Sequence, residues 1–275
     1  MLTLRDFENA YEKVQEIVLP TKLIKSDYFS DQTGNQIYLK PENMQLTGAY
    51  KIRGAYYKIS TLTEEEKKKG LITASAGNHA QGVALAAARQ GVKAVIVMPT
   101  PTPLLKVNRT KDLGAEVILY GDVYDEACEH ALALAAEKGY TFVHPFDDPT
   151  VATGQGTIMM DIFKELPTVD YVLVPIGGGG LATGVSTLAK LLNPKIKVVG
   201  VEPAGAACMK ASLKAGKVVS CGHVSTIADG TAVQTPGKLI FPYIQENVDR
   251  IITVDQEELS PWFRDLLEKP KKRAA

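Results

Sequence analysis

The sequence has few cysteines, no net charge and no long apolar run, and each of these absences narrows the possible functions. Lysine plus arginine and aspartate plus glutamate number 31 each in 275 residues, so no basic surface for nucleic acid or an anionic membrane is predicted, and a small-molecule partner is favoured. The three cysteines (Cys128, Cys208 and Cys221) include no CxxC pair, which is more typical of a reducing compartment than of a disulfide scaffold. No apolar run reaches the length of a membrane span, and the acidic residues near Met1 are untypical of a signal peptide, so we expect a cytoplasmic protein.

From about residue 71 onward, short apolar runs alternate with alanine-rich or charged segments of helical character. The runs occupy residues 71–75, 94–99, 116–120, 141–144, 171–176, 198–202 and 250–254. Helices are expected to begin near Asn78, Pro103, Tyr124, Thr153, Ala182, Ala206 and Gln256. This alternation predicts an α/β fold of open parallel sheets with helices on both faces. The best candidate for a crossing between two lobes is the proline- and aspartate-rich segment 145–149.

Four consecutive glycines follow one of these runs and precede a helical segment. Gly177, Gly178, Gly179 and Gly180 come directly after residues 171–176, and Leu181 follows them. With no side chains in the way, backbone N–H groups can close on an anion, and the N-terminus of a helix adds a partial positive charge. The pattern predicts a phosphate site. The alternative is a glycine-rich turn without a ligand.

Lys51 lies in a loop-to-helix setting, directly after the segment Thr47-Gly-Ala-Tyr50. A lysine partly removed from water has a lowered pKa and forms Schiff bases with carbonyl compounds. Most lysines are surface charges, which is the alternative for Lys51. We interpret Lys58 and residues 67–69 as a solvated helix face.

Residues 75–82, Ser-Ala-Gly-Asn-His-Ala-Gln-Gly, end a strand and start a helix. Their hydroxyl, amide and backbone N–H groups suit a small anion such as a carboxylate, and the alternative is a capped turn. His79 is interpreted as a structural hydrogen-bonding residue rather than a base, because it falls in the first turn of an apolar helix. The other histidines lack the spacing of metal ligands, so no catalytic zinc and no other metal is predicted.

Taken together, residues 47–55, 75–82 and 177–181 resemble a known family. With Ala152-Thr-Gly-Gln-Gly-Thr157 and Ala228-Asp-Gly230, the chain resembles the serine/threonine dehydratases of the fold-type II pyridoxal phosphate enzymes, in particular the biodegradative threonine dehydratases, from about residue 1 to about residue 265. The resemblance implies a two-lobed fold like that of the tryptophan synthase β subunit. Residues 52–146 would form the small domain, and residues 1–51 and 147–275 the large, cofactor-binding domain. It also implies a homodimer or homotetramer.

The resemblance further implies a role for individual residues. The lysine that matches Lys51 binds pyridoxal 5'-phosphate covalently and moves the α-proton, and the asparagine that matches Asn78 contacts the phenolic oxygen of the cofactor. By the same resemblance, the cofactor phosphate would be bound by the loop of Gly177, Gly178, Gly179, Gly180 and Leu181. The substrate carboxylate would be held by the segment of Ser75, Ala76, Gly77, Asn78 and His79. The implied reaction is the breakdown of L-threonine or L-serine by β-elimination, which yields 2-oxobutanoate or pyruvate plus ammonia.

Three features depart from related enzymes. Serine racemases that resemble this chain carry a second serine at the position of Ala76, and alanine cannot transfer a proton, so racemisation is expected to be weak or absent. Related racemases bind a divalent ion through an acidic pair, of which Glu202 matches the first member, whereas Cys208 replaces the second. The family normally has a Ser-Gly-Gly segment, in which a serine or cysteine meets the pyridine nitrogen of the cofactor. This sequence has no counterpart of that segment. We therefore expect either a C-terminally shortened form or another group in that role.

Two other interpretations stay open at this point. The segment from Gly177 to Ala182 satisfies the dinucleotide-binding pattern G-x-G-x-x-A. Glu202 follows at the ~20-residue spacing that is typical of a ribose-binding carboxylate. An NAD-dependent enzyme would leave Lys51 and residues 75–79 unexplained. The other interpretation is a pyridoxal phosphate or amino-acid binding protein with impaired catalysis.

Overall fold

The fold consists of two parallel sheets and one small antiparallel ladder, in a computed structural model that describes residues 1–260. The chain begins with α1 (Leu4–Val14), which starts at a capping box between Thr3 and Asp6. Next, β1 (Ile24–Lys25) pairs antiparallel with β2 (Tyr38–Leu39), and α2 (Asp27–Thr33) lies between them in the chain. A short 3-10 turn, η1 (Glu42–Met44), then leads towards Lys51.

The first parallel sheet has the strand order β5-β4-β3-β6. Its strands are β3 (Leu71–Ala74), β4 (Ala94–Met98), β5 (Glu116–Leu119) and β6 (Thr141–Phe142). The helices around it are α3 (Lys51–Ser60), α4 (Glu64–Lys69), α5 (Asn78–Arg89), α6 (Leu104–Asp112) and α7 (Tyr124–Lys138). Every residue of β3 and β4 is buried, because helices cover both faces of these two central strands.

The second parallel sheet has the strand order β7-β8-β9. Its strands are β7 (Tyr171–Pro175), β8 (Lys197–Pro203) and β9 (Arg250–Val254), and its helices are α8 (Pro149–Glu165), α9 (Gly180–Leu192), α10 (Cys208–Ala215) and α11 (Phe241–Asn247). Two 3-10 turns, η2 (Ala204–Ala206) and η3 (Asp229–Thr231), lie in its connections. Burial alternates along β7, so that Val172 and Val174 face the core while Tyr171 and Leu173 stay exposed among the described residues.

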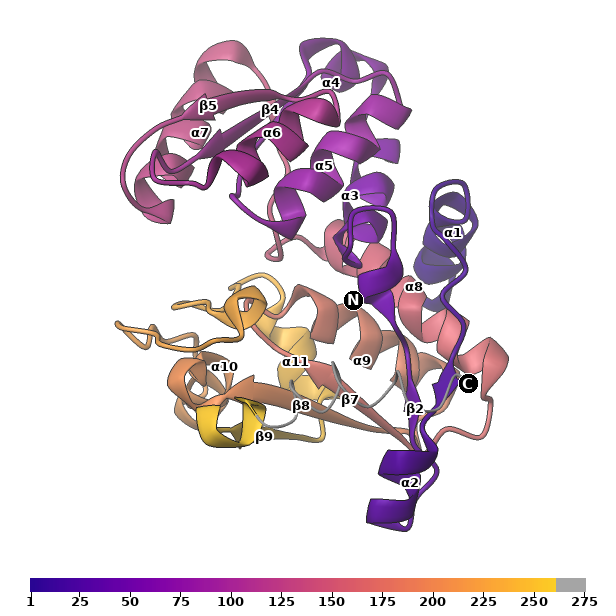
Figure 1. Ribbon diagram of the computed structural model, residues 1–275. Helices are drawn as coiled ribbons and strands as arrows, with labels where there is room; N and C mark the ends of the chain where they lie inside the picture. The colour runs from indigo at the N-terminus through magenta and orange to yellow at the C-terminus, as the bar shows by residue number, and fades with distance from the viewer. Residues whose placement is uncertain (261–275) are drawn as a thin grey trace, which may run out of the picture.

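The two sheets lie in separate lobes, with α1, α3 and α8 between them (Figure 1). Arg53 of α3 joins these parts, because its fully buried guanidinium donates to Glu42 (2.8 and 2.9 Å), to Asp161 of α8 (2.7 Å) and to Thr157 of α8 (3.1 Å). The division at residues 52 and 146 remains a proposal. Within residues 1–260, no helix is long and apolar enough to cross a bilayer.

The structure corrects three details of the sequence interpretation. Helix α8 begins at Pro149 rather than near Thr153, because the Asp148 carboxylate accepts the N–H groups of Thr150 (2.7 Å) and Val151 (3.2 Å). Lys58 is not simply solvated, since it forms an ion pair with Asp148 at 2.8 Å.

The third correction concerns the cysteines. Cys208 and Cys221 form a disulfide with their Cα atoms 5.5 Å apart, whereas Cys128 is free. Cys208 opens α10, and the chain turns back after this helix so that Cys221 lies beside it. The sequence interpretation missed this pair, because a separation of 13 residues does not show that two side chains meet in space.

Candidate active site

Lys51 is the first residue of α3, and its amine points at the connection between the lobes. Its Nζ donates a hydrogen bond to the carbonyl oxygen of Pro145 at 2.8 Å and lies 5.5 Å from the centre of the Tyr50 ring. Removal from water lowers the pKa of Lys51 to about 8. The neutral, nucleophilic form of the amine is therefore accessible near neutral pH.

The segment after β3 forms the N-terminal turn of α5. Ser75 Oγ accepts the N–H of Gly77 at 3.2 Å, Gly77 is the N-cap residue, and Asn78 starts the helix with an exposed side chain. A Cβ atom added to Gly77 would meet nothing within 4 Å, so the space above this turn is open to a ligand. The helix N-terminus supplies N–H groups and a partial positive charge there, as a carboxylate requires.

His79 is buried and has only one protein partner. Its Nε2 lies 3.0 Å from the carbonyl oxygen of Val143, while Nδ1 has no partner among the described residues. Burial, together with the nearby Lys51, lowers the pKa of His79 to about 3. The ring is therefore neutral, which agrees with a structural residue and argues against a general base.

The four glycines carry N–H groups without protein partners. Gly178, Gly179 and Gly180 are buried, and no described residue accepts a hydrogen bond from the N–H groups of Gly177, Gly178, Gly179 or Gly180. Gly179 adopts a left-handed backbone with φ of 105° as the N-cap of α9, and Leu181 packs against the core behind it. Buried N–H groups normally have an acceptor, so the free donors indicate that this loop is built for an anion.

Close packing also requires these glycines. A Cβ at Gly178 would overlap the Phe146 ring, and one at Gly180 would lie 2.9 Å from the Phe146 carbonyl oxygen. At Gly179 it would lie 2.6 Å from Ile240, and at Gly177 it would lie 3.0 Å from the Cα of Thr231. Any side chain in this loop would therefore push it away from the segments that support it.

All three segments meet at the crossing between β6 and α8. Val143 accepts the hydrogen bond of His79, Pro145 accepts that of Lys51, and Phe146 packs on the glycine loop. His144 fixes the turn of this crossing segment, since its Nδ1 accepts the N–H groups of Phe146 (3.2 Å) and Asp147 (2.8 Å). Burial lowers the pKa of His144. The proline- and aspartate-rich crossing was visible in the sequence, but its role as the meeting point of the site was not.

Comparison with known proteins identifies the family of this chain. Residues 14–271 match the family described as pyridoxal-phosphate dependent enzyme. The chain belongs to this family of pyridoxal phosphate enzymes. It is 49% identical to an L-threonine ammonia-lyase of Thermotoga maritima over 98% of this chain and 68% of that one.

Solved structures of family members have the same fold. The processed form of threonine deaminase isoform 2 from Solanum lycopersicum is 42% identical, with a TM-score of 0.93 over 97% of this chain and 78% of that one. Maize serine racemase is 33% identical, with a TM-score of 0.94 over 98% of this chain and 82% of that one. These findings confirm the fold class, the cofactor and the pyridoxal phosphate-dependent ammonia-lyase predicted from the sequence. They give no support to the NAD-dependent alternative.

The residues present fit this cofactor. The glycine loop offers free N–H groups for a phosphate, and Lys51 offers an amine with a lowered pKa for an aldehyde. Glu202, the ribose-binding candidate of the dinucleotide alternative, is buried and accepts the N–H groups of Met209 (2.8 Å) and Lys210 (2.9 Å) at the start of α10. Among the described residues, no group of three or more His, Cys, Asp or Glu side chains is arranged to hold a metal ion.

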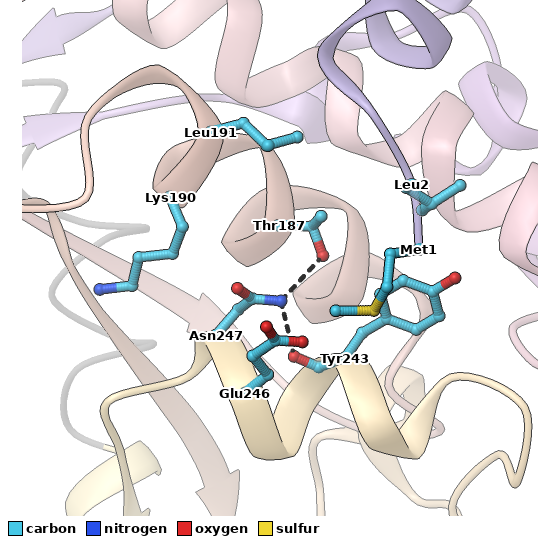
Figure 2. Close-up of a pocket in the computed structure, with 8 residues that line it drawn as sticks. All are labelled: Met1, Leu2, Thr187, Lys190, Leu191, Tyr243, Glu246 and Asn247. Atoms are coloured by element: carbon cyan, nitrogen blue, oxygen red, sulfur yellow. Dashed lines mark hydrogen bonds between the residues drawn. The ribbon is translucent and has the colours of Figure 1, made fainter.

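A separate pocket of about 290 Å³ lies between the N-terminus, α9 and α11 (Figure 2). Asn247 lies in it and donates to the carbonyl oxygen of Tyr243 (2.9 Å) and to Thr187 Oγ1 (3.4 Å). Its lining residues are Met1, Leu2, Thr187, Lys190, Leu191, Tyr243, Glu246 and Asn247. None of them is a predicted site residue, so this pocket is distinct from the candidate active site.

Proposed function

We propose that this chain removes ammonia from L-threonine, L-serine or both by pyridoxal phosphate-dependent β-elimination. The α-hydrogen and the β-hydroxyl leave as water, and hydrolysis then releases ammonia and 2-oxobutanoate from threonine or pyruvate from serine. The observation that carries this proposal is the partly buried amine of Lys51, which opens α3 beside the crossing segment in a chain that is 49% identical to an L-threonine ammonia-lyase. When bound, pyridoxal phosphate supplies the aldehyde and the electron-withdrawing ring for this chemistry.

Lys51 is the proposed covalent anchor of the cofactor and the base of the reaction. As the first residue of α3, its backbone is held by the helix, and α5 packs against it at Gly82, where an added Cβ would lie 3.1 Å from the Lys51 carbonyl carbon. This contact fixes the backbone end of the long Lys51 side chain and leaves its amine free to turn. Such an amine is suited to take the proton from the α-carbon of the substrate.

The two loops at the ends of β3 and β7 are the proposed anion sites. The turn of Ser75, Ala76, Gly77, Asn78 and His79 would bind the substrate carboxylate through the open N-terminus of α5. Gly177, Gly178, Gly179, Gly180 and Leu181 would bind the cofactor phosphate at the N-terminus of α9. Asn78, exposed at the first position of α5, is the proposed partner of the cofactor's phenolic oxygen.

Elimination is favoured over racemisation by the side chain at position 76. A racemase needs an acid on the face of the substrate opposite to the lysine, and Ala76, half-buried against the core, carries no transferable proton. Racemisation is therefore expected to be weak or absent, although serine racemases share this fold.

Oligomeric state and compartment are part of the same proposal. We expect a homodimer or homotetramer in the cytoplasm, acting on a small amino acid. Multi-angle light scattering tests the assembly. The Cys208–Cys221 disulfide is unusual for a reducing compartment, so titration of free thiols in protein taken directly from cells tests the location.

The function is tested by the absorption spectrum of the purified protein with pyridoxal phosphate, before and after L-threonine is added. We expect a visible band that changes on addition while 2-oxobutanoate accumulates. Lys51→Ala should remove both band and product. Lys68→Ala, at an exposed position on α4, should retain both. A wild-type band without product would leave a cofactor-binding protein and refute the lyase.

A further inference from the structure

Asp147 connects the interlobe crossing to the segment that supports the glycine loop. Its carboxylate accepts three backbone N–H groups, from Lys238 (3.0 Å), Leu239 (2.8 Å) and Ile240 (3.2 Å). Oδ1 accepts two of them and Oδ2 the third, so both oxygens are occupied. The carboxylate therefore holds the turn 238–240 from a position more than 90 residues away in the sequence.

The turn held by Asp147 lies directly behind the glycine loop. Gly237 donates its N–H to the carbonyl oxygen of Gly178 at 3.0 Å. A Cβ at Gly179 would lie 2.6 Å from Ile240, and Thr183 of α9 donates to the Ile240 carbonyl oxygen at 3.5 Å. Three contacts thus brace the loop and the first turn of α9 from one side.

The bond from Gly237 sets the direction of a phosphate donor. In a trans peptide the carbonyl oxygen and the following N–H point in opposite directions. Fixing the Gly178 carbonyl towards Gly237 therefore aims the N–H of Gly179 away from the supporting segment. That N–H is one of the loop donors without a protein acceptor.

We propose that Asp147 is a positioning residue for the cofactor phosphate, which orients the N–H groups of the glycine loop through the segment 237–240. This inference rests on the phosphate site of the proposed function. Asp147 also ties that loop to Lys51, because the same crossing segment accepts the Lys51 amine at Pro145. The two ends of the cofactor would therefore be held in register by one short segment.

The neighbouring aspartate provides a matched control. Asp148 caps α8 and pairs with Lys58 at 2.8 Å, and among the described residues it forms no hydrogen bond or ion pair with segment 237–240. Asp147→Asn and Asp148→Asn each remove one negative charge near the same place, and asparagine still caps helices well. At Asp147, however, the amide NH2 faces a backbone N–H in place of an acceptor oxygen.

The test compares dissociation constants for pyridoxal 5'-phosphate and for pyridoxal, measured by titration of the apoenzyme. Both aldehydes react with Lys51, but only the first has a phosphate. We expect Asp147→Asn to weaken binding of the phosphate form roughly tenfold, the scale of one hydrogen bond to a charged group, and to leave pyridoxal within about twofold. Asp148→Asn should leave the ratio of the two constants at its wild-type value. Asp147→Glu, which keeps the charge but displaces the carboxylate, should give a smaller loss and serves if Asp147→Asn does not fold.

Several outcomes would overturn the inference. Equal losses for both aldehydes would indicate general damage to the fold. An unchanged or tighter phosphate complex would mean that removing a negative charge near the phosphate outweighs the lost orientation. Equal wild-type affinities for the two aldehydes would refute the phosphate site itself, and the inference with it.

Discussion

Replacing Arg53 by methionine should be among the most destabilising single changes in this protein. The guanidinium is completely buried and donates to Glu42, Asp161 and Thr157 at 2.7 to 3.1 Å. Methionine fills a similar volume but leaves two carboxylates without their main counter-charge. Breaking a buried ion pair by removing one partner costs about 3–5 kcal/mol.

The structure favours the lower end of that range. Lys40 Nζ lies 3.6 Å from Asp161, which also accepts the Tyr11 hydroxyl, and the Thr21 hydroxyl donates to Glu42 at 2.5 Å, so neither carboxylate is left without a partner. A loss of about 3 kcal/mol corresponds to roughly 5 °C in melting temperature for a chain of this length, at about 2.1 cal/mol/K of unfolding entropy per residue. Arg53→Lys keeps the charge but loses the fork geometry, so an intermediate loss is expected.

The assay is urea unfolding of the apoenzyme followed by far-ultraviolet circular dichroism. Arg89→Met on α5 is the control, because Arg89 is exposed and substitutions at such positions usually change stability by less than about 0.5 kcal/mol. A loss at Arg53 below about 1 kcal/mol, or one equal to that at Arg89, would refute the view that this cluster holds α3 against α8.

Three further predictions concern the site. Because the pKa of Lys51 is lowered to about 8, association of pyridoxal phosphate with the apoenzyme should accelerate as pH rises through 8. Stopped-flow fluorescence from pH 6 upward measures the association rate. A rise in rate centred at about 10.4 would show an unperturbed lysine. Gly178→Ala should weaken both stability and cofactor binding, because its Cβ overlaps the Phe146 ring. Adding Phe146→Leu to this variant should restore part of the lost stability, with a coupling energy of roughly 0.5–3 kcal/mol in a double-mutant cycle measured by thermal unfolding. Additive effects of the two substitutions would contradict the contact. Ala76→Ser should introduce measurable production of D-serine from L-serine by chiral chromatography, and the absence of any D-isomer would mean that more than a hydroxyl is missing.

Much of the architecture could be predicted because local patterns decide it. The apolar runs at residues 71–75, 94–99 and 250–254 match β3, β4 and β9 to within one residue, since a buried parallel strand reads as a short continuous apolar segment. The start of α1 is likewise local, because its capping box joins Thr3 and Asp6, which are three residues apart. The start of α8 was misplaced because Pro149 and Asp148 look like loop residues until the cap is formed.

The sequence by itself determined the candidate site residues: a lysine at the start of a helix, a serine-to-histidine turn after one strand and four glycines after another, each a local motif recognisable without a structure. The tertiary structure decided how they meet. The crossing segment brings Val143, Pro145 and Phe146 to His79, Lys51 and Gly178. The tertiary structure also places Cys221 beside Cys208, and Asp147 on the turn behind the glycine loop. These contacts join residues that are not neighbours in the chain, and they depend on tertiary packing, which no local pattern of residues encodes.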